Sequence, residues 1–221
     1  MSIHINNLTF SHDDSPLLND LSFSVEKNQI GFVSGRSGIG KSTLFNIIAG
    51  LILPENGKIM LDDTLLNDKN FSLETEKRKV GYVFQELNLF PHLTNAQNIH
   101  FAKPGLPKEE VEELVTKLNL TEHLQTYPHL ISGGQQQRIA IARALVAEPA
   151  ILLVDEATGN LDLNSGDQIM DVLDQLNQNG TTICMVTHES RYADRASTQL
   201  KLLDGAILTA PTTQEAVSAA H

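Results

Sequence analysis

The chain has 221 residues, of which 41% are hydrophobic, so it is long enough to bury a core as a single domain. Its 16 Lys and Arg residues against 27 Asp and Glu residues give a formal net charge of −11, which argues against a broad nucleic-acid partner and against adhesion to an anionic membrane surface. The one cysteine, Cys184, lies in the apolar run TTICMVT, where we expect a buried structural thiol, so a disulfide framework is excluded.

The N-terminal segment MSIHINNLTF has neither the basic start nor the apolar centre of a secretion signal. No apolar run approaches the roughly 20 residues that are needed to span a bilayer. We therefore expect a soluble, cytosolic chain that reaches a membrane only through another protein.

The first part of the chain is expected to form short strands. Their alternating or apolar patterns occur at 3–10, 21–25, 29–35, 57–63 and 79–85. Between the third and fourth of these, residues 41–51 follow a helical pattern. The polar segments 11–16 and 67–78 are expected to be a turn and a loop.

The second part alternates helices with buried strands. Residues 107–119 form the clearest amphipathic helix, because apolar residues repeat there at i, i+3, i+4 and i+7. The middle section that it begins is mostly helical. The apolar runs 150–155 and 181–188 lack alternation, as strands buried on both faces of a parallel sheet do, and a helix lies between them. This order indicates an α/β fold with a parallel sheet.

GRSGIGKST at 35–43 matches the phosphate-binding pattern G-x-x-x-x-G-K-[ST] and lies between a predicted strand and a predicted helix. Glycines let successive backbone N–H groups point at phosphate oxygens, and the helix N-terminus adds its dipole. Lys41 is expected to reach the β- and γ-phosphates of a nucleotide, and the Ser42 hydroxyl is expected to hold Mg²⁺. The candidate residues of this P-loop are Gly35, Arg36, Ser37, Gly38, Ile39, Gly40, Lys41, Ser42 and Thr43.

Four polar side chains at the ends of apolar strands are expected near the P-loop, because parallel strands present their carboxyl ends at one edge of a sheet. Asp155 is the candidate Mg²⁺ ligand, and Glu156 is the candidate general base that polarises an attacking water. Gln85 is interpreted as a water or Mg²⁺ contact and His188 as a γ-phosphate contact. The alternatives are a helix-capping acid pair and ordinary structural polar residues.

SGGQQQR at 132–138 opens another predicted helix. Ser132, Gly133, Gly134 and Gln135 form either a second anion site at a helix N-terminus or only a capping turn. The three residues that follow them either brace the loop or touch the ligand.

Taken in order, GRSGIGKST, Gln85, ISGGQQQR, ILLVDE, GNLD and His188 resemble the motifs of the nucleotide-binding domain of an ATP-binding cassette (ABC) transporter, over residues 1 to about 208. The resemblance implies an α/β P-loop NTPase fold with a parallel RecA-like core sheet. It also implies an N-terminal antiparallel β subdomain and a helical signature subdomain at about 88–147. Residues 209–221 are then expected to be a loose tail.

The same resemblance implies that the chain binds ATP and Mg²⁺ and hydrolyses ATP. A second ATP-binding subunit, in a homodimer, would pair with it head to tail. The signature loop (Ser132, Gly133, Gly134 and Gln135) would then bind the γ-phosphate in trans. Leu161 and Asp162 would line the same interface.

A separate integral membrane permease would be the other partner. It would dock on the segment after Gln85, where Leu87, Leu89, Phe90 and Leu93 are expected to be exposed in a groove, unless some of them belong to the core. The subunit would be cytoplasmic and would lie on the inner face of the cell membrane through the permease. Neither nucleic acid nor direct membrane insertion is expected.

Three residues depart from the family pattern. His12 stands where the family has an aromatic residue that stacks on adenine, Ile131 replaces a leucine before SGG, and Ala157 replaces the proline after the catalytic glutamate. LFPHLT and YPHLISGGQQQR resemble importer ATPases, whereas DEATGNLD and THESRYADRAS resemble the short subunits of lipoprotein-release, macrolide-export or cell-division systems, so the direction of transport stays open. Two functions from other classes are a soluble ABC ATPase in DNA repair or translation, and an adaptor that binds ATP as a switch.

Overall fold

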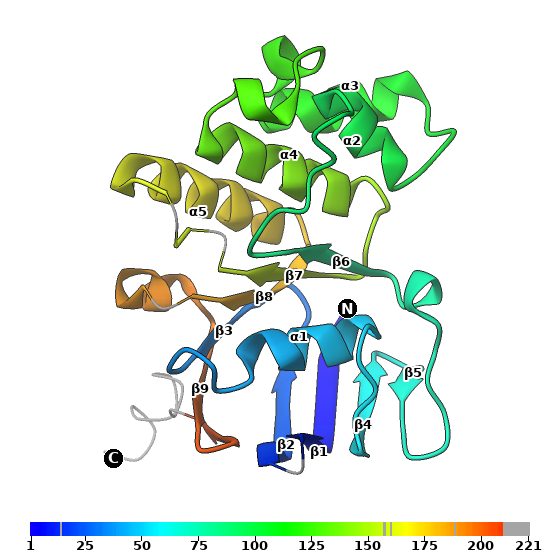
Figure 1. The fold of residues 1–221 in the computed structure, drawn as a ribbon, viewed down its shortest axis with the longest axis vertical. Helices are drawn as coiled ribbons and strands as arrows, with labels where there is room; N and C mark the ends of the chain where they lie inside the picture. Colours follow the sequence, from blue (N-terminus) through cyan, green and yellow to red (C-terminus); the bar gives the residue numbers. More distant parts are fainter. Residues whose placement is uncertain (14, 157, 160, 188, 210–221) are drawn as a thin grey trace, which may run out of the picture.

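The computed structural model describes residues 1–13, 15–156, 158–159, 161–187 and 189–209. Over these residues the chain forms two β-sheets with one helix between them and further helices on the far side of the second sheet (Figure 1). The arrangement has the predicted α/β class, with an antiparallel N-terminal sheet and a mainly parallel core sheet.

The N-terminal sheet is antiparallel throughout. Its strands are β1 (Ile3–His12), β2 (Ser15–Val25), β4 (Asn56–Leu61) and β5 (Thr64–Asn67), in the order β2-β1-β4-β5. β2 begins six residues before the predicted strand, because it stays paired with β1 as far as His12 and Ser15 at the end of the hairpin.

The core sheet carries the strands that reach the candidate site. It contains β3 (Ile30–Ser34), β6 (Val80–Val83), β7 (Ile151–Asp155), β8 (Thr182–Val186), β9 (Thr198–Leu203) and β10 (Ala206–Thr209). Their order is β10-β9-β3-β8-β7-β6, and only the β9–β10 pair is antiparallel. The carboxyl ends of β3, β6, β7 and β8 therefore meet at one edge.

The helices connect these strands. They are α1 (Lys41–Ala49), α2 (Asn95–Phe101), α3 (Lys108–Lys117), α4 (Gly133–Leu145) and α5 (Leu163–Gln178). Short 3₁₀ turns are η1 (Thr75–Lys77), η2 (Thr121–His123), η3 (Pro128–Leu130) and η4 (Ser190–Arg195).

Three apolar clusters hold the layers together. The first joins both sheets to α1, whose side chains Leu44, Phe45 and Ile48 are fully buried in it. The second packs α4 and α5 on the other face of the core sheet, and the third joins α2, α3 and α4. Because α4 contributes to the second and third clusters, it ties the helices at the top of Figure 1 to the core sheet.

The pattern analysis missed three strands and found the others. β5 lies partly in the segment that precedes the predicted loop, and β9 and β10 follow the last predicted strand. All three lie at or near sheet edges, where short strands half exposed to water carry a weak apolar pattern. The predicted tail at 209–221 lies outside the described residues except for Thr209, which ends β10.

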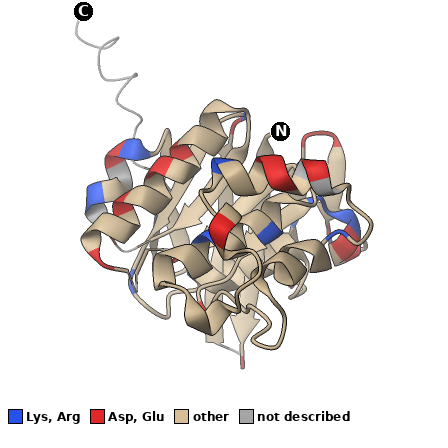
Figure 2. Ribbon diagram, turned by 90° about the horizontal axis from the view of Figure 1, so that it is seen from above, with Lys and Arg blue, Asp and Glu red and all other residues tan. Residues whose placement is uncertain are grey.

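Seen from above, Lys and Arg residues are interspersed with Asp and Glu residues along the helices (Figure 2). Mixed charges of this kind are typical of a solvated surface. Among the helices in the described part of the chain, none combines the length and apolar character that crossing a bilayer requires.

Arg78 is fully buried below the end of α1, with 1% of its surface exposed. Its guanidinium donates to the carbonyls of Ile47 and Ile48 at 2.9 Å each, and to the carbonyl of Leu73 at 2.8 Å. The carbonyls in the last turn of a helix have no partner within the helix; that of Ile47 also accepts from the N–H of Gly50 at 3.0 Å, and Arg78 adds donors to this end of α1. Burial lowers the pKa of Arg78 without removing its charge.

We predict that Arg78→Ala lowers the free energy of unfolding by about 3 kcal/mol, because it leaves buried carbonyls without donors and opens a cavity. Urea denaturation followed by circular dichroism measures this change. The control is Lys77→Ala, which removes an exposed cation paired with Glu74 three residues before it. A loss for Arg78→Ala no larger than for this control would contradict the structural role.

Candidate functional site

The P-loop turns sharply between β3 and α1. Gly40 is the residue that precedes the helix, and its φ of 106° lies in the left-handed region. A Cβ at this position would lie 2.8 Å from Cδ2 of Leu18, so the turn has no room for a side chain. The first backbone hydrogen bond of α1 follows at once, from the N–H of Leu44 to the carbonyl of Gly40 at 2.8 Å.

Lys41 folds back over the P-loop and is 6% exposed. Its Nζ donates to the carbonyls of Gly35 and Arg36, at 3.0 and 2.9 Å. A buried ammonium held by neutral carbonyls is a fixed positive charge, and the N–H groups at the start of α1 add to its field. The loop is therefore suited to a multiply charged anion.

A cavity of about 170 Å³ lies at this loop. It brings the P-loop together with two residues from distant parts of the sequence, Gln85 and Glu156. Its lining consists of Ser37, Gly38, Gly40, Lys41, Ser42, Thr43, Gln85 and Glu156. Of the other predicted P-loop residues, Gly35 and Arg36 hold Lys41, and the side chain of Ile39 packs against the first apolar cluster.

Asp155 ends β7 beside this cavity and is 3% exposed. Its Oδ2 accepts from the hydroxyl of Tyr82 at 3.4 Å, whereas Oδ1 has no hydrogen-bond partner among the described residues. Burial raises the pKa of the Asp155 carboxyl, the charge of Glu156 adds to this, and a hydrogen bond with Ser42 opposes it.

A buried carboxylate oxygen that lacks a donor is suited to a hard cation such as Mg²⁺. No group of three or more His, Cys, Asp or Glu residues that could enclose a metal lies in the described part of the chain. This fits Mg²⁺, which keeps several waters and usually takes one or two carboxylates together with phosphate oxygens. The residues present therefore fit a nucleotide-bound Mg²⁺ at Asp155 and Ser42.

Glu156 is held in an unusual backbone conformation. Its φ of 50° lies in the left-handed region, which a residue with a side chain rarely adopts. Its N–H donates to the carbonyl of Val186 at 2.9 Å, so β8 fixes the turn that aims the side chain at the cavity. Strained backbone of this kind concentrates at functional sites.

The signature loop is built as a helix cap. The Ser132 hydroxyl accepts from the N–H of Gln135 at 3.3 Å, and Oε1 of Gln135 accepts from the N–H of Ser132 at 2.9 Å, which is a complete capping box. Gln136 braces the loop through the carbonyls of Pro128 and Ile131, at 2.9 and 3.2 Å. Ser132 and Gly133 stay exposed at the tip.

The signature loop lies outside the P-loop cavity of the same chain, at a neighbouring cavity that shares Gln85 and Glu156 with it. No described residue of the signature loop lines the P-loop cavity. Gly133 instead borders a second cavity of about 230 Å³, whose lining includes Gln85, Glu156 and Leu161. One chain therefore presents a phosphate cradle at one place and an exposed helix N-terminus at another.

His188, a predicted site residue, and Ala157 lie outside the described residues. His12 ends β1 with its side chain 77% exposed and its Nε2 3.6 Å from Asp13, and it does not line the P-loop cavity.

Sequence reasoning missed Tyr82 and Arg143. Tyr82 contacts Asp155, and Arg143 of α4 donates to the carbonyls of Leu87 and Asn88, at 2.5 and 2.6 Å. Arg143 thereby fixes the segment that follows Gln85. Tyr82 could have been found from its place in the strand before Gln85, but the contacts of Arg143 span more than 50 residues of sequence and leave no local pattern.

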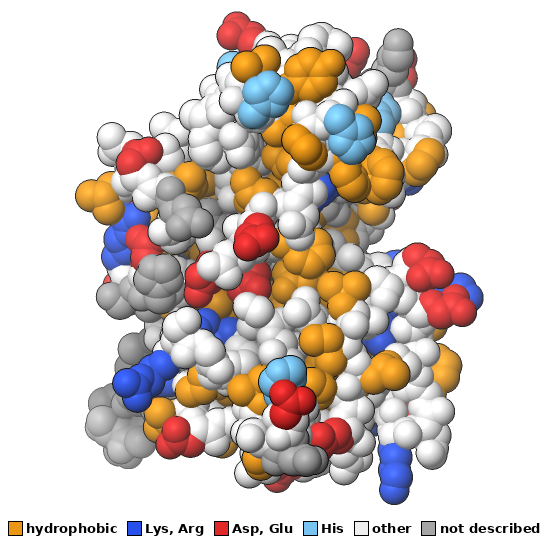
Figure 3. Space-filling model, viewed as in Figure 1, with side chains coloured by type: hydrophobic (Ala, Val, Ile, Leu, Met, Phe, Trp, Pro, Cys, Tyr) orange, Lys and Arg blue, Asp and Glu red, His pale blue; other side chains and the backbone are white. Residues whose placement is uncertain are grey.

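Of the four residues expected either in a docking groove or in the core, which are Leu87, Leu89, Phe90 and Leu93, Phe90 lines a groove and Leu87 and Leu89 belong to the core. All four are half-buried, and Leu87 and Leu89 pack against the apolar clusters. This hydrophobic groove of about 530 Å³ lies next to them, between the helical part and the lower part of the molecule (Figure 3). Its aromatic lining is Tyr82, Phe84, Phe90 and Phe101.

Comparison with known proteins agrees with this geometry. The family model for ABC transporters matches residues 18–159. The lipoprotein-releasing system ATP-binding protein LolD of Aquifex aeolicus is 41% identical over 201 residues, covering 87% of this chain and 89% of that protein. The ABC transporter ATP-binding protein YtrE of Bacillus subtilis is 37% identical over 205 residues, covering 88% of each.

Among solved structures, the dimeric post-hydrolysis state of the ATP-binding cassette MJ0796 bound to ADP and Pi is similar, with a TM-score of 0.81 and 31% identity. The match covers 93% of this chain and 96% of that chain. The chain thus belongs to the ABC transporter family, in which it is an ATP-binding subunit that hydrolyses ATP.

Proposed function

We propose that two copies of this chain pair head to tail around two ATP molecules and drive a separate integral membrane permease. The observation that carries this proposal is that Ser132 and Gly133 stay exposed at the tip of the signature loop and do not line the P-loop cavity of their own chain. The P-loop of one copy then needs the signature loop of a second copy to complete the ATP site. The dimeric form of the similar MJ0796 cassette supports the pairing.

The proposed reaction is an in-line attack of water on the γ-phosphate, which releases ADP and phosphate. Lys41 and the backbone N–H groups of the P-loop stabilise the charge on the transferring phosphoryl group. Glu156 accepts the proton of the attacking water, and Gln85 orients that water. His188 contacts the γ-phosphate, and Ser132, Gly133, Gly134 and Gln135 of the other copy close over it.

Mg²⁺ is proposed to accompany the nucleotide. Ser42, Asp155 and Gln85 would hold it, since Oδ1 of Asp155 is buried with no hydrogen-bond partner in the described part of the chain and Gln85 lines the P-loop cavity. When bound, the ion neutralises charge on the β- and γ-phosphate oxygens. His12, exposed at the end of β1, is proposed to stack on the adenine base.

The permease is proposed to dock in the aromatic groove beside the segment after Gln85. Phe101 is 60% exposed, and its ring lies 4.6 Å from that of Phe90, so the groove presents a preformed apolar surface. Docking there places the subunit in the cytoplasm at the inner face of the cell membrane. Arg143 lines the same groove and holds the loop that follows Gln85. A partner in the groove can therefore shift the position of Gln85 at the catalytic edge, which is the edge of the core sheet where Gln85, Asp155 and Glu156 lie.

We predict that Glu156→Gln keeps ATP binding but lowers the rate of hydrolysis by about 100-fold or more, because the amide cannot accept the proton. ATP should then trap a dimer, which size-exclusion chromatography detects. Glu148→Gln is the matched control, because that carboxylate pairs with Lys103 far from the cavity. Turnover by Glu156→Gln at the wild-type rate would rule out the assignment of the base.

Lys41→Ala and Ser132→Arg are expected to fail in different ways. Lys41→Ala should weaken ATP binding by about tenfold or more, since it removes the charge-assisted contact to phosphate. Ser132→Arg should leave binding by the monomer within about twofold but abolish dimer formation and turnover, because the new side chain blocks the interface. Isothermal titration calorimetry separates the two outcomes. If Ser132→Arg lowers monomer affinity as much as Lys41→Ala does, the loop serves its own nucleotide and the proposed dimer is wrong.

The permease is tested by affinity purification from detergent-solubilised membranes. We predict that an integral membrane permease copurifies with the wild-type chain and is lost with Phe101→Asp, while basal ATPase activity is unchanged. Leu53→Asp is the control, because Leu53 is similarly exposed, at 65%, and does not line the groove. Equal recovery with Phe101→Asp and Leu53→Asp would contradict docking in this groove.

A further inference from the structure

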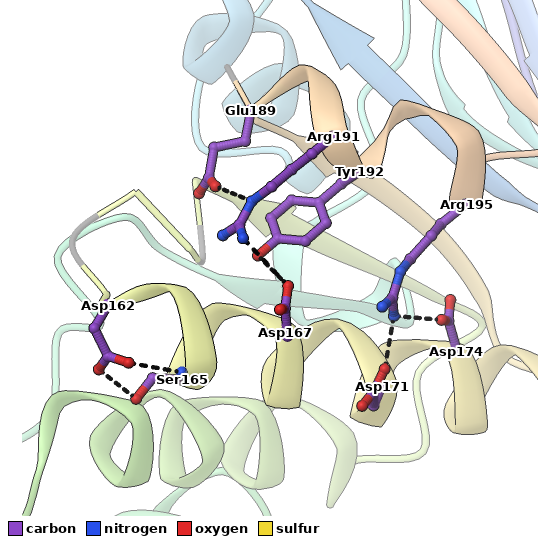
Figure 4. Close-up of polar contacts among 9 residues, drawn as sticks. All are labelled: Asp162, Ser165, Asp167, Asp171, Asp174, Glu189, Arg191, Tyr192 and Arg195. Atoms are coloured by element: carbon purple, nitrogen blue, oxygen red, sulfur yellow. Dashed lines mark hydrogen bonds and ion pairs between the residues drawn. The ribbon is translucent and has the colours of Figure 1, made fainter.

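The turn η4 is fastened to the side of α5 by a row of polar contacts (Figure 4). Nη1 of Arg195 lies 2.8 Å from Asp171 and 2.7 Å from Asp174. The hydroxyl of Tyr192 donates to Oδ1 of Asp167 at 3.1 Å. Nη1 of Arg191 lies 3.4 Å from the same Asp167 oxygen. We call this set the α5 latch: Asp167, Asp171, Asp174, Arg191, Tyr192 and Arg195.

Tyr192 is the buried member of the latch. It is 2% exposed and belongs to the apolar cluster between the core sheet and α5. Burial raises the pKa of Tyr192 to about 12, so the hydroxyl remains a donor at neutral pH. Among the donors of the latch, Tyr192 is far less exposed than Arg191 and Arg195, whose side chains are 35% and 32% exposed, and ion pairs made by exposed groups contribute little. The hydrogen bond from Tyr192 to Asp167 is therefore the principal joint.

The contact at this joint is close. A Cβ at Gly166 would lie 2.7 Å from the Tyr192 hydroxyl and 3.2 Å from Nη2 of Arg191. Only glycine lets η4 approach α5 so nearly, and tightly packed elements move together rather than deform.

On one side, the latch leads to the catalytic edge. η4 follows β8 after three residues, and the N–H of Glu189 donates to Oγ1 of Thr187 at 3.1 Å. Val186, which ends β8, accepts the N–H of Glu156 at 2.9 Å. The backbone that carries the candidate base is thus joined through β8 to η4.

On the other side, α5 leads to the signature loop. Asp162 caps α5 by accepting from the N–H and the hydroxyl of Ser165, at 3.1 and 2.7 Å. A Cβ at Gly134 would lie 3.3 Å from Cβ of Ser165, so the first turns of α4 and α5 are in close contact. Nη2 of Arg138 also donates to Oε1 of Gln168 at 2.7 Å.

We propose that α5 is a rigid link between the catalytic edge of a chain and the signature loop that the same chain offers to its partner, with the Tyr192–Asp167 hydrogen bond as its joint. The proposal rests on the head-to-tail dimer of the proposed function. In that dimer the catalytic edge of each chain holds that chain's own ATP, and the signature loop of the same chain contacts the ATP bound by the partner. Nucleotide at one site therefore favours closure of the other, and Tyr192 and Asp167 are positioning residues for it.

The test compares dimer formation with ATP binding by the monomer. Latch variants are placed in a Glu156→Gln background, and the ATP concentration for half-maximal dimer formation is measured by sedimentation velocity. The same variants in a Ser132→Arg background give the dissociation constant of ATP for the monomer. Tyr192→Phe keeps the buried ring and loses only the hydroxyl.

We expect Tyr192→Phe and Asp167→Ala to raise the half-saturating ATP concentration for dimer formation about fivefold or more. The monomer dissociation constant should change by less than about twofold. Asp167→Asn keeps an acceptor for the Tyr192 hydroxyl and should resemble the parent. Glu113→Ala, which removes an exposed carboxylate paired with Lys117 at 2.7 Å, is the control and should have no effect.

The proposal is wrong if Tyr192→Phe leaves the half-saturating ATP concentration for dimer formation unchanged. It is also wrong if that concentration rises by the same factor as the dissociation constant of ATP for the monomer. If Asp167→Asn raises the half-saturating ATP concentration as much as Asp167→Ala does, the charge of Asp167 matters rather than its hydrogen bond. The assignment of the Tyr192–Asp167 hydrogen bond as the joint is then wrong. If the Glu156→Gln parent stays monomeric at saturating ATP, the proposed dimer is itself wrong, and this inference falls with it.

Discussion

Two opposite charges buried at one edge of the core sheet determine the rest of the site. Lys41 is held in the P-loop by neutral carbonyls, and Asp155 is buried at the end of β7 with one oxygen lacking a partner among the described residues. Burying either charge is costly unless a ligand of opposite charge arrives. A phosphate group would neutralise Lys41 and a divalent cation would neutralise Asp155, so the residues at this sheet edge fit the nucleotide and the Mg²⁺ that we propose. Parallel strands make this possible, because they bring residues far apart in sequence to the same edge.

The helical part of the chain serves a different purpose. Its signature loop is a fully capped helix N-terminus that lies exposed, and it does not line the chain's own P-loop cavity. The capping box and Gln136 fix its shape before any ligand is present, so little conformational entropy remains to be lost on binding. Because the loop is exposed in this way, we propose that a pair of chains, rather than one chain, is the unit of function. The cluster that α4 shares with the core sheet, together with α5, explains how the loop can nevertheless respond to events at the catalytic edge.

Sequence reasoning succeeded where the information is local. The P-loop, the strand that ends at Asp155 and the SGGQ helix start each occupy a short contiguous segment whose spacing encodes a backbone shape. It failed where pairs distant in sequence decide the outcome. Arg78 under α1, Arg143 behind Gln85 and Tyr192 against Asp167 all join elements that only the fold brings together. Leu87 and Leu89 illustrate the same limit, since an apolar residue in a loop looks alike whether it faces a partner or the core.

The central claim is that each active site is composed of the P-loop of one chain and the signature loop of another. Mixing purified Lys41→Ala and Ser132→Ala chains is the sharpest test, because Ser132→Ala removes the signature-loop hydroxyl without adding a side chain that blocks the interface. A mixed dimer has one site in which both elements are damaged and one in which both are intact. We expect the mixture to hydrolyse ATP at a rate well above the sum of the rates of the two variants measured alone. A mixture as inactive as its separate components would contradict the shared site.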